Sequence, residues 1–468
     1  MYIKWNHRIV LLLAVMVMMA SAVMAGQKSS DNVWERADRT QLQQPGIDTA
    51  GLPAAYETFR LNKAALEALL RQAPEEFSGG TPIILSLPMP DGSLSRFEIE
   101  HSLVVESGLL KNYPELGATY RGRGIDDPTA SARFDFLPSG FHSMILSSNG
   151  TVIVNPFVKG DTDNYISYFK QDGAVGGKFD CDVKGDDAFE SVTSLNTNLE
   201  SYDFLRGSGG SPIAPEVISG TQLRTYRLAL AADWEYCNAV GSNTVAGCLA
   251  AQVLIMNRVN GVYERDVAIH MNIIANNNLI VFAGDSGNCS GACTSANDPY
   301  TDSDGAAMLS QNQSTVDTRI GSGNYDIGHV FSTGGGGIAA LGVPCGGSKA
   351  QGVTGLPNPV GDDFAIDYVA HEMGHQWGAN HTFNSTVDNC GGGNRSAGSA
   401  YEPGSGITIM AYAGICGNQD LAQHSIDTFH VKSLEVITAY SQTGQGNTCA
   451  VTTASGNTPR TGPTMRSR

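Results

Sequence analysis

Charged residues are scarce in this 468-residue chain, at 16% of the total, and no block of Lys and Arg occurs. With 46 acidic and 29 basic residues the net charge is −17, which argues against nucleic acid and anionic membranes as partners. Internal repeats and heptads are also absent, so the chain is neither a repeat array nor a coiled coil. Hydrophobic residues make up 41%, enough for a core, and this excludes wholesale disorder. The 55 Gly and 19 Pro favour turns and loops over long helices.

After the N-terminus we find no segment that is long and apolar enough to span a membrane. At the N-terminus, basic residues precede an apolar run over residues 9–20, and small residues follow up to Ala25. This order predicts a signal peptide over residues 1–25, with cleavage after Ala25 or Ala22. The alternative is a membrane anchor, but the run is shorter than the roughly 20 residues that a spanning helix needs. We therefore expect a secreted protein, without a membrane span after signal removal, in which disulfides can form.

A Gly-, Ser- and Pro-rich stretch over residues 206–222 predicts an exposed linker and processing region. The region before it, residues 26–205, has a mainly β pattern with one short helix over residues 61–70. Asn149-Gly150 between two alternating apolar runs is a strong hairpin signal. The strands expected in this region cover residues 83–87, 95–99, 142–146 and 151–154.

After the linker the pattern changes to α/β, over residues 223–450, and a flexible tail is expected over residues 451–468. Strands are expected over residues 223–231, 270–274, 279–282, 325–332 and 338–343. Helices are expected over residues 244–263, 363–380 and 422–440.

One motif carries chemistry, the run His-Glu-Met-Gly-His-Gln-Trp-Gly-Ala-Asn-His over residues 371–381. His371 and His375 are four apart, so on a helix they share one face and can bind one metal. Glu372 lies beside that metal without having to bind it. Gly378 can end the helix with a positive φ, which allows His381 to return as a third ligand. Three imidazoles and one open position predict a catalytic zinc site.

Two alternative roles for these histidines fit the pattern less well. They could be ordinary surface or core residues of a helix, but three His in this arrangement require a reason. A thermolysin-like site would use a downstream Glu as the third ligand, which His381 makes unnecessary. Downstream lies Ile407-Thr-Ile-Met410-Ala-Tyr412, and an extended His motif followed by such a Met-turn is the metzincin signature.

With these motifs the sequence resembles the metzincin metallopeptidases, in particular secreted reprolysin-like (adamalysin-like) zinc proteases of bacterial type, over residues 220–450. The resemblance implies an α/β (α+β) catalytic domain with a twisted mixed sheet and an active-site helix, preceded by a mainly β propeptide. Thr382 departs from adamalysins, which usually have Asp there, whereas Tyr412 is similar to astacins and serralysins, where it can be a further zinc ligand. The subfamily therefore stays open.

This resemblance implies a zinc endopeptidase (EC 3.4.24 type), made as a zymogen, that acts on proteins or peptides; we expect it to be a monomer. The implied roles are zinc ligands (His371, His375, His381), general base (Glu372), oxyanion stabiliser (Tyr412) and apolar floor (Met410). Tyr412 could instead only pack beside the Met-turn. The runner-up function is an extracellular binding or adhesion module with a non-catalytic zinc site, although a mere ligand set does not need Glu372.

The run over residues 337–342 lies where the edge strand borders the cleft in this family. An edge strand can pair with an extended peptide, so we expect a substrate contact there; the alternative is an ordinary strand. The candidate residues are Gly337, Ile338, Ala339, Ala340 and Leu341.

Asp298, Asp302 and Asp304 resemble an oxygen-rich cation loop, which makes calcium a candidate second metal; such runs are otherwise solvated turns. His329, on an expected strand, is interpreted as a hydrogen-bonded structural residue rather than a ligand.

Of the nine Cys only Cys181 precedes the linker. The eight downstream Cys can pair among themselves in 105 ways. We predict Cys390–Cys416, and similarity to adamalysins implies Cys345–Cys449; Cys237, Cys248, Cys289 and Cys293 are left over. A free thiolate is a good zinc ligand, so Cys181 is a candidate zymogen switch. The position of this lone Cys ahead of the catalytic domain resembles that in metzincin propeptides. Asp182 replaces the usual Gly after it, and a buried or intermolecular Cys is the alternative.

Overall fold

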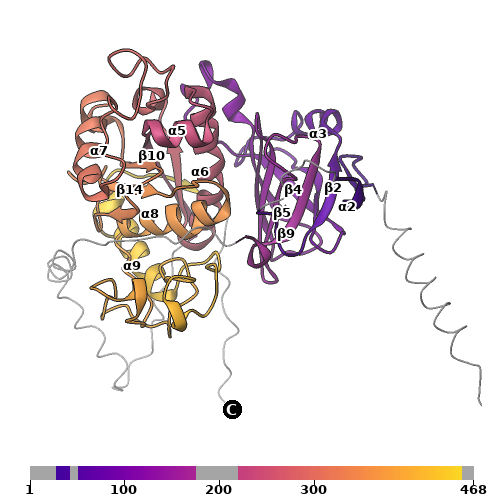
Figure 1. Cartoon of the computed structure of the whole chain (residues 1–468). Helices are drawn as coiled ribbons and strands as arrows, with labels where there is room; N and C mark the ends of the chain where they lie inside the picture. Colours follow the sequence, from indigo (N-terminus) through magenta and orange to yellow (C-terminus); the bar gives the residue numbers. More distant parts are fainter. Residues whose placement is uncertain (1–27, 43–50, 175–219, 456–468) are drawn as a thin grey trace, which may run out of the picture. The chain divides into compact units, whose positions relative to one another are not determined.

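The structure is a computed structural model that describes residues 28–42, 51–174 and 220–455 (Figure 1). Its contacts divide the chain into an N-terminal unit, up to Ser102 and from Ala118 to Ala174, and a C-terminal unit, Leu103–Gly117 and from 175 onward. The expected signal peptide, Cys181 and most of the 206–222 linker lie outside the described residues. The two units are described separately.

The N-terminal unit is an antiparallel nine-stranded sheet in the order β1-β2-β9-β8-β7-β6-β5-β4-β3, as the mainly β pattern predicts. The sheet curls, so that its first and last strands approach each other: the Ser86 N–H of β3 donates to Asp31 Oδ2, near β1, at 2.7 Å. Its elements are β1 (Trp34–Arg36), α2 (Arg39–Leu42), β2 (Glu57–Leu61), α3 (Lys63–Leu70), β3 (Ile83–Pro88), β4 (Leu94–His101), β5 (Thr119–Gly124), β6 (Ser131–Leu137), β7 (Gly140–Ser147), β8 (Gly150–Pro156) and β9 (Asn164–Phe169).

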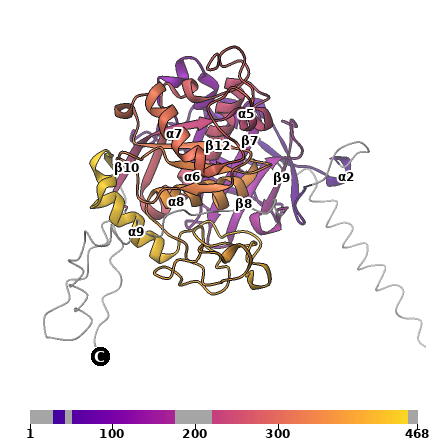
Figure 2. The same ribbon diagram turned by 60° about the vertical axis from the view of Figure 1, so that its left-hand side comes forward.

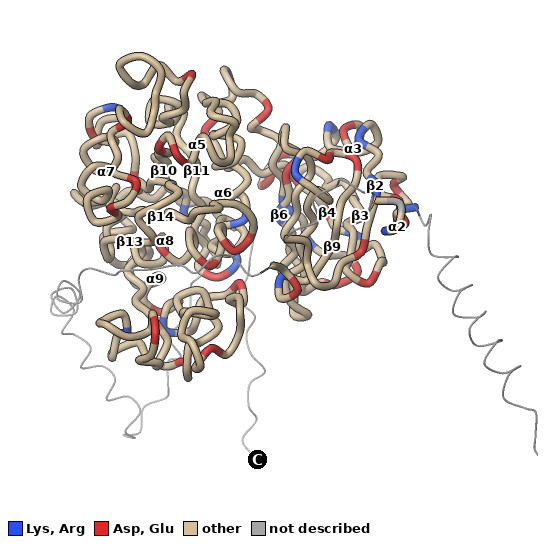
Figure 3. The backbone as a smooth tube through the Cα atoms, in the orientation of Figure 1, with Lys and Arg blue, Asp and Glu red and all other residues tan. Residues whose placement is uncertain are grey.

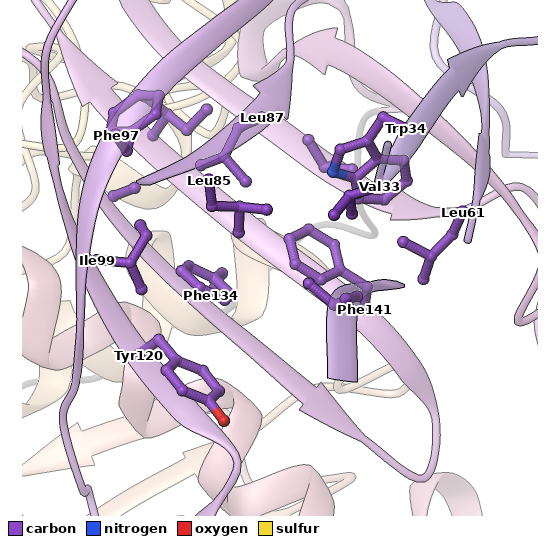
Figure 4. Packing of buried hydrophobic residues seen from close by; sticks show 14 of the residues in the cluster. Val33, Trp34, Leu61, Leu85, Leu87, Phe97, Ile99, Tyr120, Phe134 and Phe141 are labelled. Carbon is purple, nitrogen blue, oxygen red and sulfur yellow. The ribbon is translucent and has the colours of Figure 1, made fainter. Parts of the chain in front are cut away.

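The core of this unit lies inside the curl and is rich in aromatic rings (Figure 4). Trp34 meets Phe141 edge to face with ring centroids 5.1 Å apart, and Phe134 stacks on Phe141 at 5.4 Å. The predicted Asn-Gly hairpin is present between β7 and β8, with Gly150 at φ +111°. Only glycine adopts that conformation readily, and this explains the turn.

The C-terminal unit is built on a mixed sheet in the order β11-β10-β12-β14-β13, with β15 pairing β10. The central pairs are parallel, whereas β13 and β15 are antiparallel to their neighbours. Residues 451–454, expected to begin a flexible tail, instead form the strand that pairs with β10. The strands are β10 (Gln222–Ala232), β11 (Ile269–Ile273), β12 (Ile327–Ser332), β13 (Gly337–Ala339), β14 (Gly352–Gly355) and β15 (Val451–Ala454).

Helices cover both faces of this sheet (Figures 1 and 2). Val330 of β12 lies in a core cluster with α7, whereas the next residue, Phe331, packs against Tyr236 of α5 and Phe364. Successive strand side chains point to opposite faces, so α7 and the helix containing Phe364 lie on opposite sides. The helices are α5 (Trp234–Val240), α6 (Val245–Val267), α7 (Gly305–Arg319), the π-helix η8 (Asp363–Ala370), α8 (His371–Gln376) and α9 (Val431–Gln442).

Four expected elements differ from those observed. The strand expected over residues 338–343 is shorter, since β13 ends at Ala339. Residues 277–280 form a short 3₁₀ helix instead of a strand, because Asn277 bonds to Leu230 of β10 through both side-chain atoms. The helix expected from residue 422 begins at Val431, since Asp266 Oδ2 accepts the Phe429 N–H and holds the preceding segment. The helix expected over residues 363–380 consists of a π-helical half and α8, which ends at Gln376.

Contrary to the expectation from sequence, one helix among the described residues, α6, is long and apolar enough to cross a membrane, by length and composition alone. However, 78% of its apolar window is buried inside the structure. Such burial is what the core helix of a folded domain shows, and α6 packs on β11 and η8.

The segment Leu103–Gly117 lies in sequence within the N-terminal region but belongs to the C-terminal unit. It extends the sheet beside β11: Ile273 N–H donates to Val104 O at 2.9 Å and Glu106 N–H donates to Ile273 O at 2.8 Å. The Glu106 carboxylate also accepts the Ala275 N–H at 2.8 Å. The chain therefore passes into the C-terminal unit and out again before the linker.

Candidate metal centre

Helix α8 carries the first half of the His motif. His371 and His375 lie one turn apart, as expected, and both are buried. The helix ends at Gln376, and Gly378 takes φ +94°, the left-handed conformation predicted for it. The chain reverses there and brings His381 back beside the other two rings.

The three inner ring nitrogens converge on one point. His375 Nε2 lies 3.1 Å from His371 Nε2 and 3.0 Å from His381 Nε2. Each outer nitrogen, Nδ1, contacts a backbone carbonyl. His371 Nδ1 lies 2.6 Å from Ile409 O, and His375 Nδ1 lies 2.8 Å from Ala379 O. His381 Nδ1 lies 2.6 Å from Asn394 O.

This arrangement fits a metal ion. A carbonyl can only accept, so each Nδ1 carries the proton and each Nε2 presents a lone pair. The three Nε2 atoms lie within 4.8 Å of one another, and lone pairs this close repel unless a cation lies among them. Burial lowers the pKa of His371 to about 4 and, with neighbouring imidazoles, lowers the pKa values of His375 and His381 well below the usual value. The imidazoles therefore stay neutral at neutral pH, the form that binds zinc.

Glu372 follows the first ligand on α8 and is fully buried. Burial raises the pKa of Tyr263 of α6, and the negative charge of the Glu372 carboxylate raises it further. The Tyr263 hydroxyl donates to Ala370 O at 2.8 Å, at the start of α8. Glu372 is thus part of the packed interior of the centre.

The Met-turn lies against α8. A Cβ on Gly374 would meet Met410 Sδ at 2.4 Å, so glycine is needed for this close approach. Met410 O accepts the Thr382 N–H at 3.0 Å, and this ties the turn to the segment of the third His. The Tyr412 ring centroid lies 4.5 Å from that of His381 and 5.7 Å from that of His371.

Sequence reasoning missed Glu402, a buried carboxylate that organises the Met-turn. It accepts hydrogen bonds from the Thr382 and Thr408 hydroxyls and from the Ile407 and Thr408 N–H groups, the last two at 2.9 and 3.1 Å. No local motif marks this residue, because its partners come from both sides of it in the sequence. Thr382, which departs from the adamalysin pattern, therefore has a structural partner here.

A second missed residue is Gln376, which fixes α8 to the sheet. His329 Nδ1 lies 2.8 Å from Gln376 Oε1 and its Nε2 lies 2.8 Å from Thr354 Oγ1. Gln376 Nε2 donates to Gly328 O at 2.8 Å. The structural interpretation of His329 is therefore confirmed, and burial lowers its pKa to about 4.

The expected edge strand is the last strand of the sheet. β13 spans Gly337–Ala339 and pairs only with β14 among the described strands. After Ala340 and Leu341, the Gly342 N–H donates to His375 O at 3.2 Å and the Val343 N–H to Gln376 O at 2.9 Å. The edge strand thus runs directly into contact with the end of the His helix.

Among the described residues, the three aspartates of the expected cation loop do not form one group that could hold a metal ion. Asp298 accepts the N–H groups of Trp234 and Tyr300, and Asp304 caps α7 by accepting the Ala307 N–H at 3.0 Å. Asp302 alone joins a cluster of carboxylates, with partners from outside the loop.

The eight downstream Cys form four disulfides. Both predicted pairs are confirmed, and the four left-over Cys pair with each other. Cα–Cα distances are 5.3 Å for Cys390–Cys416, 5.6 Å for Cys345–Cys449, 4.9 Å for Cys237–Cys248 and 5.2 Å for Cys289–Cys293.

Residues 245–434 match the sequence profile of Metallo-peptidase family M12B, Reprolysin-like. This region is a reprolysin-like metzincin domain. The matched residues include all three His, Glu372 and the Met-turn, and membership of a peptidase family implies protein or peptide substrates. A solved structure, metalloproteinase-II from Bacteroides fragilis, is 12% identical and aligns over 79% of this chain and 97% of its own, with a TM-score of 0.35. No curated protein sequence matches the chain.

Proposed function

We propose that this metzincin is a secreted zinc endopeptidase made as an inactive precursor. The observation that carries the proposal is the convergence of three neutral, buried imidazoles beside Glu372. His371, His375 and His381 would hold the zinc.

When held by these three imidazoles, zinc would make a water acidic enough to attack near neutral pH and would polarise the substrate carbonyl. Glu372, next to the first ligand, accepts the proton of the attacking water and delivers it to the leaving amine. The Tyr412 hydroxyl, on a ring beside His381 and His371, donates to the developing oxyanion. Met410 packs beneath Gly374 and takes no part in the chemistry.

An extended substrate would pair with β13, the end strand of the sheet, through backbone hydrogen bonds. The edge continues through Ala340 and Leu341 to the contact with His375 O. This connection would align a bound peptide with the His helix.

Precursor inhibition and export rest on the sequence. Cys181 is the one Cys of the sequence outside these four disulfides, and we propose that it would occupy the fourth zinc position. The N-terminal signal peptide would direct export. A Cys181→Ala precursor should be active before the 206–222 linker is cut. If it stays inactive until cleavage, inhibition is steric and the thiol is not the switch.

The test of catalysis compares Glu372→Gln with wild type on a general protein substrate such as casein, after cleavage in the linker. The variant should keep stoichiometric zinc, because the three His remain, and lose about 10²–10⁴-fold in turnover. Glu435→Gln, on the exposed ion pair with Lys432 of α9, is the matched control and should leave turnover unchanged. A chelator should abolish wild-type activity, and zinc should restore it.

Near-normal proteolysis by Glu372→Gln would show that Glu372 is not the general base. A wild-type protein that binds zinc yet cleaves nothing after processing would instead support a binding module with a non-catalytic zinc site.

A further inference from the structure

Three carboxylates outside the His site converge where β10 leads into α5. Asp233, Glu235 and Asp302 each offer one oxygen, and these oxygens lie within 4.8 Å of one another. Asp233 precedes α5, Glu235 is in its first turn, and Asp302 comes from the loop before α7. The cluster thus joins segments about 70 residues apart in the chain.

The cluster has no basic counterpart in the described part of the chain. Acidic and basic residues are interspersed over both units in Figure 3, but none of the ion pairs of the described residues includes these three carboxylates. Burial and the neighbouring carboxylates raise the pKa of Asp233 well above its usual value, and burial, with Asp298 and Asp302, raises that of Glu235. Without a cation these acids disfavour one another's charge.

A second observation points to a ligand. Asp233 is fully buried; its Oδ1 accepts the Tyr236 N–H at 2.8 Å, but its Oδ2 has no hydrogen-bond partner. The nearby Ser332 hydroxyl has a single proton, and it donates this to Asp302 Oδ1. A cap for α5 needs only Oδ1, so capping does not explain the orphaned oxygen or the approach of Asp302.

The cluster also lies at a position of the sheet suited to ligands. Asp233 follows β10 and Ser332 ends β12, which are parallel neighbours. From β10 the chain continues to β11 on one side, and from β12 it continues to β13 and β14 on the other. In open α/β sheets ligands bind at the carboxyl ends of strands where the connections diverge in this way.

We propose that Asp233, Glu235 and Asp302 bind a Ca²⁺ ion that fastens the loop before α7 to the carboxyl ends of β10 and β12. The donors are all carboxylate oxygens, which favour a hard cation over zinc. Calcium accepts irregular oxygen sets from loops, whereas Mg²⁺ demands near-ideal octahedral geometry. Glu235 and Asp302 are partly exposed, which leaves a route for the ion and for water ligands. This site replaces the predicted set, from which only Asp302 remains.

The site is tested in full-length, zinc-loaded protein carrying Glu372→Gln to prevent self-cleavage. Calcium at 100 times its dissociation constant should raise Tm by about 5–10 °C. Asp302→Asn should lose this rise. Asp304→Asn is the matched control, because Asn still caps α7 and residue 304 lies outside the cluster; it should keep the rise.

Terbium, which replaces Ca²⁺, gives a readout independent of stability. Trp234 lies between two of the ligands in sequence, so excitation of tryptophan should produce terbium emission that Ca²⁺ abolishes by competition. Trp234→Phe should remove most of that emission while keeping the calcium-dependent rise in Tm. If wild type shows neither the rise in Tm nor calcium-sensitive emission, or if Asp302→Asn keeps both, the proposal is wrong. Neither measurement depends on proteolysis, so this outcome would leave the proposed function untouched.

Discussion

Each ligand of the His site is oriented by a different backbone carbonyl, and this sets how much of the site a sequence can predict. The spacing of His371, His375 and His381 follows from helix geometry and one glycine, so the triad could be predicted. The carbonyls that fix their outer nitrogens belong to residues 379, 394 and 409. Backbone carbonyls occur at every position, so no sequence signal distinguishes these three.

Tyr412 gives a prediction at this scale. Tyr412→Phe keeps the ring that packs on His381 and Phe383 and removes only the hydroxyl. If that hydroxyl stabilises the oxyanion, kcat should fall about 10- to 1000-fold with little change in zinc affinity. Steady-state kinetics and zinc titration measure the two effects. Tyr401→Phe, on an exposed ring, is the control, and an unchanged kcat in Tyr412→Phe would mean that Tyr412 only packs.

Glu402 is a further test at the residue scale. Glu402→Gln replaces the oxygen that accepts from two threonine hydroxyls with an amide nitrogen, which can only donate, and it removes the charge. The variant should lose about 1–3 kcal/mol of unfolding free energy, and Thr382→Val, which removes one donor, about 1 kcal/mol. Urea unfolding at neutral pH measures both. Equal stability of Glu402→Gln and wild type would show that the carboxylate does not hold the Met-turn.

At the scale of elements, strong local patterns were predicted and tertiary anchors were not. The β7–β8 hairpin and α6 follow from a turn signal and from helical spacing. The strand expected at residues 279–282 failed because Asn277 bonds to β10, a long-range contact that outweighs local β propensity. Helix α7 was missed because its sequence reads as polar, although Met308 and Val316 bury one side of it.

Because the buried His329 anchors α8 through Gln376, we predict that the stability of the fold depends on pH. The pKa of His329 is lowered by burial to about 4 in the folded protein, against about 6.5 when unfolded. Below pH 6.5 the unfolded chain binds the extra proton, so the stability that neutral His329 contributes is lost as pH falls from 6.5 towards 4.

His329→Gln, which cannot titrate there, isolates this effect. Its loss of stability relative to wild type should be largest at pH 7 and shrink by roughly 2–3 kcal/mol at pH 4.5. Urea unfolding of metal-free protein at both pH values provides the measurement. A difference that does not change with pH would mean that the pKa of His329 is the same in the folded and the unfolded protein.

At the scale of the whole molecule, the family could be predicted from one motif, but the boundary between the units could not. The sequence pattern placed residues 26–205 in one region, whereas Leu103–Gly117 belongs with the C-terminal unit. We predict that protein cut once in the 206–222 linker elutes from gel filtration with both fragments together and separates in urea. Glu106→Ala, which removes the carboxylate bond to Ala275, should weaken the association, whereas Glu115→Ala should not. Complete separation without denaturant would contradict this.

The same segment protects the sheet. Residues 103–106 cover part of the outer edge of β11, and an uncovered strand edge is a template for pairing with another chain. A shortened protein that begins at residue 220 would expose this edge, and we expect it to self-associate at concentrations where the longer chain does not. A synthetic peptide with the sequence of residues 103–117, added in trans, should return it to a monomer. The N-terminal region would then be needed for solubility during folding, in addition to the inhibitory role proposed for it.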